Sequence, residues 1–248
     1  GDPIERGRPR GAEAVGAALD ACGSALRSPA DAAEVDRILH GAVREAKRRR
    51  RAAGVPHPEI DILAVWSEVL DRCRASGLTA GDPSGVDLEK LALVHECVVN
   101  PVWLMPGAAD TLAALRGRGR VLGIVSNAQF YTPVILHALL GADLGDLGVD
   151  DGCSAWSYRA GIGKPDPALF GLAAGGLRAR HGIAPGDALF VGNHMEKDVA
   201  AAAAAGFRTC LFAGDAGSLR TKVRSGAPVH PDAVVTALDQ VPGLLGRP

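Results

Sequence analysis

Apolar residues between positions 11 and 100 recur at the three- and four-residue spacing of amphipathic helices. Two such stripes are Val15, Ala18, Leu19 and Cys22, and then Val35, Ile38, Leu39, Ala42 and Val43. Charged residues lie between the apolar ones, so each stripe predicts a helix with one buried face. Asp31, Asp61 and Asp87 each precede such a pattern and are expected to cap the second, third and fourth helices. The pattern therefore predicts an all-helical domain over residues 11–100.

The pattern changes after Pro101 to short apolar runs that alternate with helical stretches. The runs are residues 121–125, 153–158, 188–191, 209–212 and 233–235, and the helical stretches are 107–117, 132–141, 167–181 and 195–205. Continuous apolar runs of this length are typical of strands buried on both faces of a parallel sheet. We therefore expect residues 101–248 to form a doubly wound α/β domain of the Rossmann-like type, whose ligands bind at the carboxyl ends of the strands.

Composition excludes several classes of protein. Of the 248 residues 47% are hydrophobic, and the formal net charge is only −1, so neither a nucleic-acid partner nor a membrane surface is expected. No apolar stretch is long enough to span a bilayer. The five cysteines are scattered without CxxC spacing, which argues against a disulfide framework and a zinc site and favours a reducing, cytoplasmic environment. Nothing in the sequence predicts the oligomeric state.

Polar residues follow the apolar runs where a ligand is expected. Residues 121–125 lead into Ser126 and Asn127, whose hydroxyl and amide suit an anionic oxygen. The alternative is that Ser126 caps the next helix. Lys164 lies between glycines and prolines in the segment 161–167, which would project one cation toward a phosphate or carboxylate. The alternative for Lys164 is an ordinary surface lysine.

A third polar pair follows the run 188–191. Asn193 and Asp198 are five residues apart across a predicted strand-to-helix loop, and their oxygens could converge on Mg2+. The alternative for Asp198 is an exposed carboxylate that interacts with the helix dipole.

The three segments, in this order and each after a predicted strand, resemble the motifs of the haloacid dehalogenase-like hydrolase superfamily. Its second motif is a hydrophobic strand ending in Ser or Thr, its third a lysine often followed by proline, and its fourth a strand leading to GDxxxD or GDxxxxD. The matches here are Ser126, Lys164-Pro165 and, with one change, Gly192-Asn193 to Asp198. The resemblance covers about residues 101–238. It also implies that the helical residues 11–100 form a cap domain inserted into the core, with residues 1–10 as the remnant of the linker between core and cap.

The resemblance implies a Mg2+-dependent phosphatase that acts on a small phosphorylated metabolite through an aspartyl-phosphate. Ser126 would bind a phosphoryl oxygen, Asn127 would orient the substrate and Lys164 would neutralise charge. Asp198 and Asn193 would hold the metal.

Two departures from the family pattern affect this expectation. The family's nucleophile is the first aspartate of a DxD-type motif at the end of the first core strand, and no predicted strand here ends in such a sequence. We therefore expect a chain truncated near that strand, and no activity for the 248 residues alone. In addition, Asn193 stands where the family usually has an acidic ligand, which removes one negative charge and should weaken metal binding.

Two other functions fit the same residues. A haloacid dehalogenase uses the same aspartate to displace halide without a metal, and Asn193 favours it, whereas Asp198 and the Gly-Lys-Pro segment favour phosphate. The other alternative is a catalytically inactive binding or scaffold protein that has kept the fold.

Overall fold

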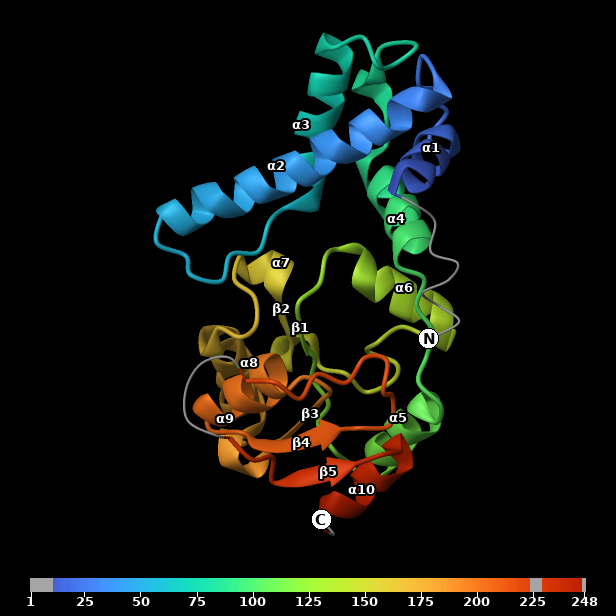
Figure 1. The fold of residues 1–248 in the computed structure, drawn as a ribbon. Helices are drawn as coiled ribbons and strands as arrows, with labels where there is room; N and C mark the ends of the chain where they lie inside the picture. The colour runs from blue at the N-terminus through green and yellow to red at the C-terminus, as the bar shows by residue number, and fades with distance from the viewer. Residues whose placement is uncertain (1–10, 224–228, 247–248) are drawn as a thin grey trace. The chain divides into compact units, whose positions relative to one another are not determined.

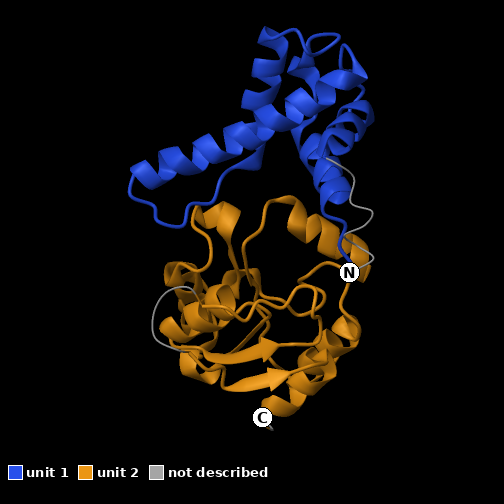
Figure 2. Cartoon of the chain, in the orientation of Figure 1, with its two compact units in different colours: residues 1–103 blue, residues 104–248 orange. Residues whose placement is uncertain are grey.

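The computed structural model describes residues 11–223 and 229–246. The chain divides into two compact units, residues 1–103 and residues 104–248, which Figure 2 shows in different colours. Residues 1–10, which the sequence suggested as a remnant of a linker, lie outside the described residues. No helix in the described ranges has both the length and the apolar character needed to cross a membrane.

The first unit consists of helices joined by short turns. Its elements are α1 (Gly11–Ala21), η1 (Pro29–Asp31), α2 (Ala32–Ala52), α3 (Ile62–Ala75), η2 (Pro83–Gly85) and α4 (Leu88–Val99). The apolar stripes that predicted the helices form the core of the unit, where Val15, Val35, Val69 and Leu91 are fully buried. Each helix therefore contributes one face to a shared interior, as its spacing indicated.

Two of the three expected helix caps are confirmed and one works differently. Asp61 accepts hydrogen bonds from the amides of Leu63 and Ala64, and Asp87 accepts one from the amide of Lys90. Asp31 precedes α2 but makes no side-chain cap there. Its carboxylate instead accepts a hydrogen bond from the Ser28 amide at 2.9 Å, in a capping box at the start of the short helix η1. An extra 3-10 turn before α2 thus takes the carboxylate that the sequence assigned to α2.

The second unit alternates strands and helices (Figure 1). Its strands are β1 (Val125–Ser126), β2 (Ala155–Trp156), β3 (Leu189–Gly192), β4 (Arg208–Phe212) and β5 (Ala233–Val235). Its longer helices are α5 (Ala108–Gly117), α6 (Tyr131–Leu140) and α8 (Pro167–His181). The shorter helical elements are η3 (Asp151–Cys153), α7 (Ser157–Ala160), η4 (Pro185–Asp187), the π-helix η5 (Met195–Ala200), α9 (Ala201–Ala204), η6 (Leu238–Gln240) and α10 (Val241–Leu244).

The five strands form two parallel sheets. One sheet has the order β1-β2, with Val125 opposite Ala155, and the other has the order β3-β4-β5, with Val191 opposite Cys210. No strand in the described residues pairs with the second edge of β1 or of β3. Parallel strands connected by helices confirm the predicted α/β fold class with a separate all-helical part.

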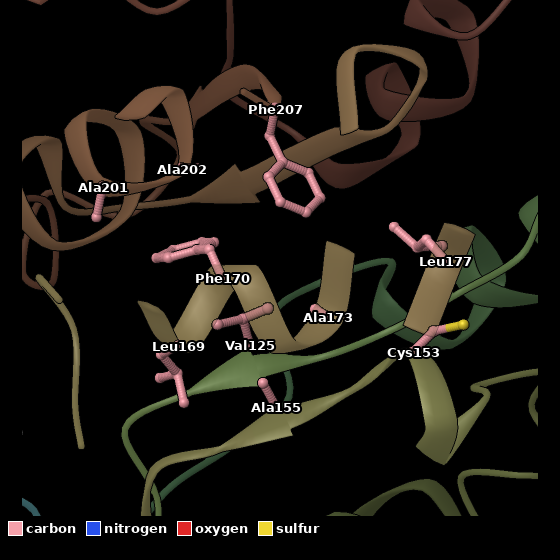
Figure 3. Close-up of a cluster of buried hydrophobic side chains, with 10 residues drawn as sticks. All are labelled: Val125, Cys153, Ala155, Leu169, Phe170, Ala173, Leu177, Ala201, Ala202 and Phe207. Atoms are coloured by element: carbon pink, nitrogen blue, oxygen red, sulfur yellow. The ribbon is translucent and has the colours of Figure 1, made fainter. Parts of the chain in front are cut away.

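A buried apolar cluster around α8 joins the two sheets. Figure 3 shows Val125 of β1, Ala155 of β2 and Phe170 of α8 in this cluster, together with Phe207 just before β4. Phe170 is fully buried and stacks edge-on against Phe190 of β3, with ring centroids 4.8 Å apart. Burial of one such side chain stabilises the fold by about 1.5–3 kcal/mol. Helix α8 therefore holds β1 and β3 near each other although they do not pair.

Candidate functional site

The residues singled out in the sequence lie at or after the carboxyl ends of β1 and β3, or in the loop between α7 and α8. Ser126 ends β1 and is half-buried, and Asn127 follows it. Helix α6 begins at Tyr131 with Phe130 as its N-cap, so the alternative in which Ser126 caps the next helix is wrong. Asn193 follows β3, and Asp198 lies in the π-helix η5. Lys164 lies between α7 and α8, and its peptide bond to Pro165 is cis.

Lys164 connects β1 of one sheet with the helix η5 that follows β3 of the other. Its Nζ donates to the main-chain oxygen of Val125 at 3.1 Å and to Oδ1 of Asp198 at 2.6 Å. Only 13% of the Lys164 side chain and 6% of the Asp198 side chain are exposed. The ion pair is therefore largely removed from water, where its attraction is screened little. Neither the surface-lysine alternative nor the exposed-carboxylate alternative describes these two residues.

Asp198 is fixed in place by hydrogen bonds to the loop that precedes its helix. Its Oδ2 accepts the amide of Asn193 at 3.1 Å and the amide of His194 at 3.0 Å. The approach requires a glycine at position 192, because a Cβ there would lie 2.5 Å from the Cβ of Asp198. The glycine that ends β3, six residues before the aspartate, thus has a steric cause.

The Asn127 side chain is bonded to the main chain of Lys164 on both sides. Its Nδ2 donates to the Lys164 oxygen at 3.0 Å, and its Oδ1 accepts the Lys164 amide at 2.6 Å. A Cβ at Gly163 would come within 3.1 Å of Asn127 Oδ1, so the glycine leaves room for this contact. These bonds hold the backbone from which the Lys164 ammonium extends.

The Asn193 side chain is anchored outside the ion pair. Its Nδ2 donates to the main-chain oxygen of Ser218 at 3.2 Å. The next residue, His194, caps η5 by accepting the amides of Glu196 and Lys197 at its Nδ1. Burial lowers the pKa of His194, and the charge of Lys197 lowers it further. His194 is thus held as a neutral acceptor that fixes the start of the helix carrying Asp198.

Ser157 supports the same region and was not identified in the sequence. It is fully buried at the start of α7, where its hydroxyl donates to the Ala128 oxygen at 3.1 Å and accepts the Ala128 amide at 2.8 Å. It therefore ties the chain after β2 to the chain after β1. The signal was hidden because Ser157 lies inside the predicted run 153–158, whereas the strand itself ends at Trp156.

The site offers oxygen atoms of the kind that bind magnesium. Each carboxylate oxygen offers two lone pairs, and Oδ1 of Asp198 uses one of them for Lys164. Magnesium is usually held by one or two carboxylates together with waters and substrate phosphate. Asp198 is thus one suitable ligand, and Asn193 at the end of β3 carries the second candidate oxygen.

Comparisons with known proteins agree on one family. The sequence profile of the family described as haloacid dehalogenase-like hydrolase matches residues 13–206. A phosphoserine phosphatase from Thermus thermophilus is 36% identical over 105 residues, which are 42% of this chain and 39% of that protein. The chain thus aligns with well under half of the length of this curated relative.

Solved structures show the same fold. A 2-haloacid dehalogenase from Pseudomonas syringae pv. Tomato DC3000 is 24% identical with a TM-score of 0.57, covering 94% of this chain and 90% of that one. An L-2-haloacid dehalogenase from Xanthobacter autotrophicus is 21% identical with a TM-score of 0.53, covering 95% and 92%. The profile match extends over more than half of the sequence. The chain belongs to the haloacid dehalogenase-like hydrolases.

Proposed function

We propose that this chain forms the phosphate-binding part of a phosphatase that acts on a small phosphorylated metabolite through an aspartyl-phosphate. The observation that carries the proposal is the largely buried ammonium of Lys164, held between Val125 of β1 and Asp198 of η5. A fixed cation in a partly dry site stabilises the charge of a phosphoryl group in the transition state. The likeness of part of the chain to a phosphoserine phosphatase supports phosphate as the bound group.

In this proposal each residue has a defined task. The hydroxyl of Ser126 donates to a phosphoryl oxygen, and Lys164 neutralises negative charge on the phosphoryl group. Asn127 positions Lys164 through the two bonds to its backbone, which is a more specific task than the substrate contact expected from sequence. Asp198 and Asn193 would hold Mg2+, which when bound would neutralise charge on the phosphoryl oxygens.

The nucleophile remains unassigned in the described residues. None of the five described strands ends in an aspartate; the residues that follow them are Asn127, Ser157, Asn193, Ala213 and Thr236. Within the described ranges one edge of β1 and one edge of β3 have no partner strand, and Lys164 bonds to Val125 of β1 and to Asp198 in the helix after β3. A parallel strand paired with these edges would bring an aspartate at its end to the ammonium, where its oxygen could attack phosphorus as the substrate alcohol leaves.

Binding of inorganic phosphate to the 248-residue chain tests the proposal without requiring turnover. Titration calorimetry with and without Mg2+ should show binding that is strengthened by the metal and lost in Lys164→Met. Lys197→Met is the matched control. Lys197 lies in η5 but its side chain is exposed, so this substitution should leave the affinity unchanged. Phosphate binding that survives Lys164→Met would refute the site, and no binding to the unaltered chain would favour the scaffold function.

A turnover assay addresses the nucleophile separately. The 248-residue chain is expected to release no phosphate from phosphoserine or p-nitrophenyl phosphate above background. Mg2+-dependent turnover would show that an aspartate within these residues performs the attack.

A metal-free dehalogenase is the second candidate, and the observation that favours it is the neutral Asn193 after β3. If it holds, a 2-chlorocarboxylate should displace phosphate from the site, and Mg2+ should not affect either affinity. A strong effect of Mg2+ on phosphate binding alone would exclude this candidate.

A further inference from the structure

A second cluster of chemically active side chains lies at the opposite end of the second unit's strands. Asp150 and Cys153 lie in or beside η3, directly before β2, whereas the phosphate-binding residues follow strand ends. His181 is the last residue of α8. Because the amino ends of parallel strands lie at the edge opposite their carboxyl ends, this cluster is separate from the Lys164 site.

The three side chains can converge on one point. One oxygen of Asp150, Sγ of Cys153 and a ring nitrogen of His181 all lie within 4.8 Å of one another. The closest pair is Asp150 Oδ2 and His181 Nε2, at 2.8 Å. Tetrahedral zinc with bonds of about 2.0–2.3 Å spaces its ligand atoms by roughly 3.3–3.8 Å. Small side-chain rotations would therefore bring the three atoms to the distances that zinc requires.

Glycines bring the two segments together. A Cβ on Gly176 of α8 would lie 1.8 Å from the main-chain oxygen of Gly152, so the helix can pack directly on η3 only with glycine at position 176. The loop itself is fixed, because the Asp150 carboxylate accepts the Gly152 amide at 2.9 Å. The close packing places the last turn of α8, with His181, over Asp150. Asp150 and His181, 31 positions apart in sequence, thus meet without any local spacing motif.

We propose that Asp150, Cys153 and His181 form a binding site for a borderline-soft divalent cation such as Zn2+. Thiolate and imidazole select zinc and its neighbours among the first-row metals over Mg2+, and the carboxylate adds a negative charge. Three protein ligands leave a fourth position for water. Cys153 is buried, whereas 19% of the Asp150 side chain and 32% of the His181 side chain are exposed, which gives the ion an entry path.

Two features of the site oppose the metal and sharpen the test. Burial raises the pKa of the Cys153 thiol, and the neighbouring Asp150 raises it further, so the metal must displace a proton there. In addition, Arg180 Nε donates to the same Asp150 oxygen that contacts His181, at 2.9 Å. Removal of the Arg180 charge should therefore strengthen binding.

Cobalt titration of the 248-residue chain tests the site through an optical signature independent of any enzymatic activity. Co2+ bound by a thiolate gives a near-ultraviolet charge-transfer band, which Zn2+ should abolish by displacement. Loss of an outer-shell partner costs about 10–100-fold in metal affinity, so loss of a direct ligand in Cys153→Ser or His181→Ala should cost at least tenfold and remove the band or shift it. Arg180→Gln should bind several-fold more tightly.

His137→Ala is the matched control, because His137 also contacts a carboxylate, Asp143 at 2.9 Å, but no cysteine belongs to that pair. It should leave the cobalt spectrum unchanged. Because Cys153 is buried, its replacement could prevent folding, and thermal melts without metal show whether each variant folds. His181 is exposed, so His181→Ala should fold like the unaltered chain. Absence of the charge-transfer band in the unaltered chain, or a band that His181→Ala leaves intact, would overturn the proposal.

Discussion

Lys164 Nζ lies 2.6 Å from Asp198 Oδ1 in η5 and also donates to the Val125 oxygen of β1, so one ammonium connects a strand of one sheet with the helix that follows β3 of the other. Both side chains are largely buried. Desolvation of two charges is costly, and their attraction offsets this cost only while both partners are present. The pair is therefore costly to break from either side, and its geometry is fixed before any ligand arrives.

Removal of one partner of the ion pair should destabilise the protein strongly, and removal of both should cost less than the sum of the two single effects. We expect Asp198→Ala to lower the free energy of unfolding by about 3–5 kcal/mol, because it leaves the Lys164 charge buried without a partner. Lys164→Met should also destabilise. The double variant should be more stable than the sum of the single effects predicts, by more than about 1 kcal/mol. Urea unfolding of the four proteins measures this coupling.

An exposed ion pair provides the control for this cycle. Arg74 and Asp71 lie 3.4 Å apart on α3, with 57% and 70% of their side chains exposed. Their coupling should be below about 0.5 kcal/mol. Equal coupling energies for the two pairs would contradict the importance of burial at Lys164.

Loss of the Asn127 side chain should weaken phosphate binding although the side chain itself bonds only to protein. Asn127→Ala removes both hydrogen bonds to the Lys164 backbone, and we expect phosphate affinity to fall about tenfold, the equivalent of about 1.4 kcal/mol. Asn100→Ala removes a side-chain bond to Glu96 on α4 and should leave the affinity unchanged. If Asn127→Ala changes stability but not phosphate affinity, the residue has no positioning role.

Sequence patterns predicted the features that depend on neighbouring residues. Hydrophobic spacing located the four α-helices that the structure describes in the first unit. The polar residues after apolar runs led to Ser126 and Asn193. The bond of Asn127 to the Lys164 backbone was not predictable, because it depends on how two loops 37 residues apart meet. β1 is shorter than its apolar run indicated: Leu122 forms only an isolated bridge with Val149, and regular pairing with β2 is confined to Val125 and Ser126.

Contacts that glycines make possible were not predictable from sequence for a related reason. The cluster of Asp150, Cys153 and His181 forms because Gly152 and Gly176 allow backbone contact, and a glycine in a sequence gives no sign of which distant segment it faces. The scattered cysteines argued against a zinc site, because sequence spacing reports only sites built from local ligands.

Adjacent glycines in α8 should respond to alanine in opposite directions. Gly176→Ala would place a Cβ 1.8 Å from the Gly152 oxygen, so we expect it to destabilise the protein by about 1–3 kcal/mol or more. Gly175→Ala meets no atom within 4 Å and should stabilise the helix by about 0.5–1 kcal/mol. Thermal and urea unfolding of both variants check the sign. Similar effects of the two substitutions would show that α8 does not pack as closely on η3 as described.

His95 should make the protein less stable in mild acid. Its Nε2 is buried and has no hydrogen-bond partner among the residues that the structure describes, and its ring stacks edge-on against Trp66 at 5.2 Å. Burial lowers the pKa of His95; the charge of His40 acts in the same direction, whereas Glu96 and Asp36 oppose the shift. Below about pH 6.5 the unfolded chain therefore takes up a proton that the folded chain resists. Stability is complete above that pH and falls as the pH drops toward the lowered pKa.

Replacement of His95 by phenylalanine should remove this part of the pH dependence. His95→Phe keeps an aromatic ring against Trp66 and eliminates the unpaired nitrogen, so we expect equal or greater stability at pH 7.5 and a clearly smaller loss between pH 7.5 and 5.5. His57→Gln, at an exposed position, should behave like the unaltered chain. Urea unfolding at the two pH values gives the free energies. An unchanged pH slope in His95→Phe would mean that other groups, and not this buried imidazole, control stability in acid.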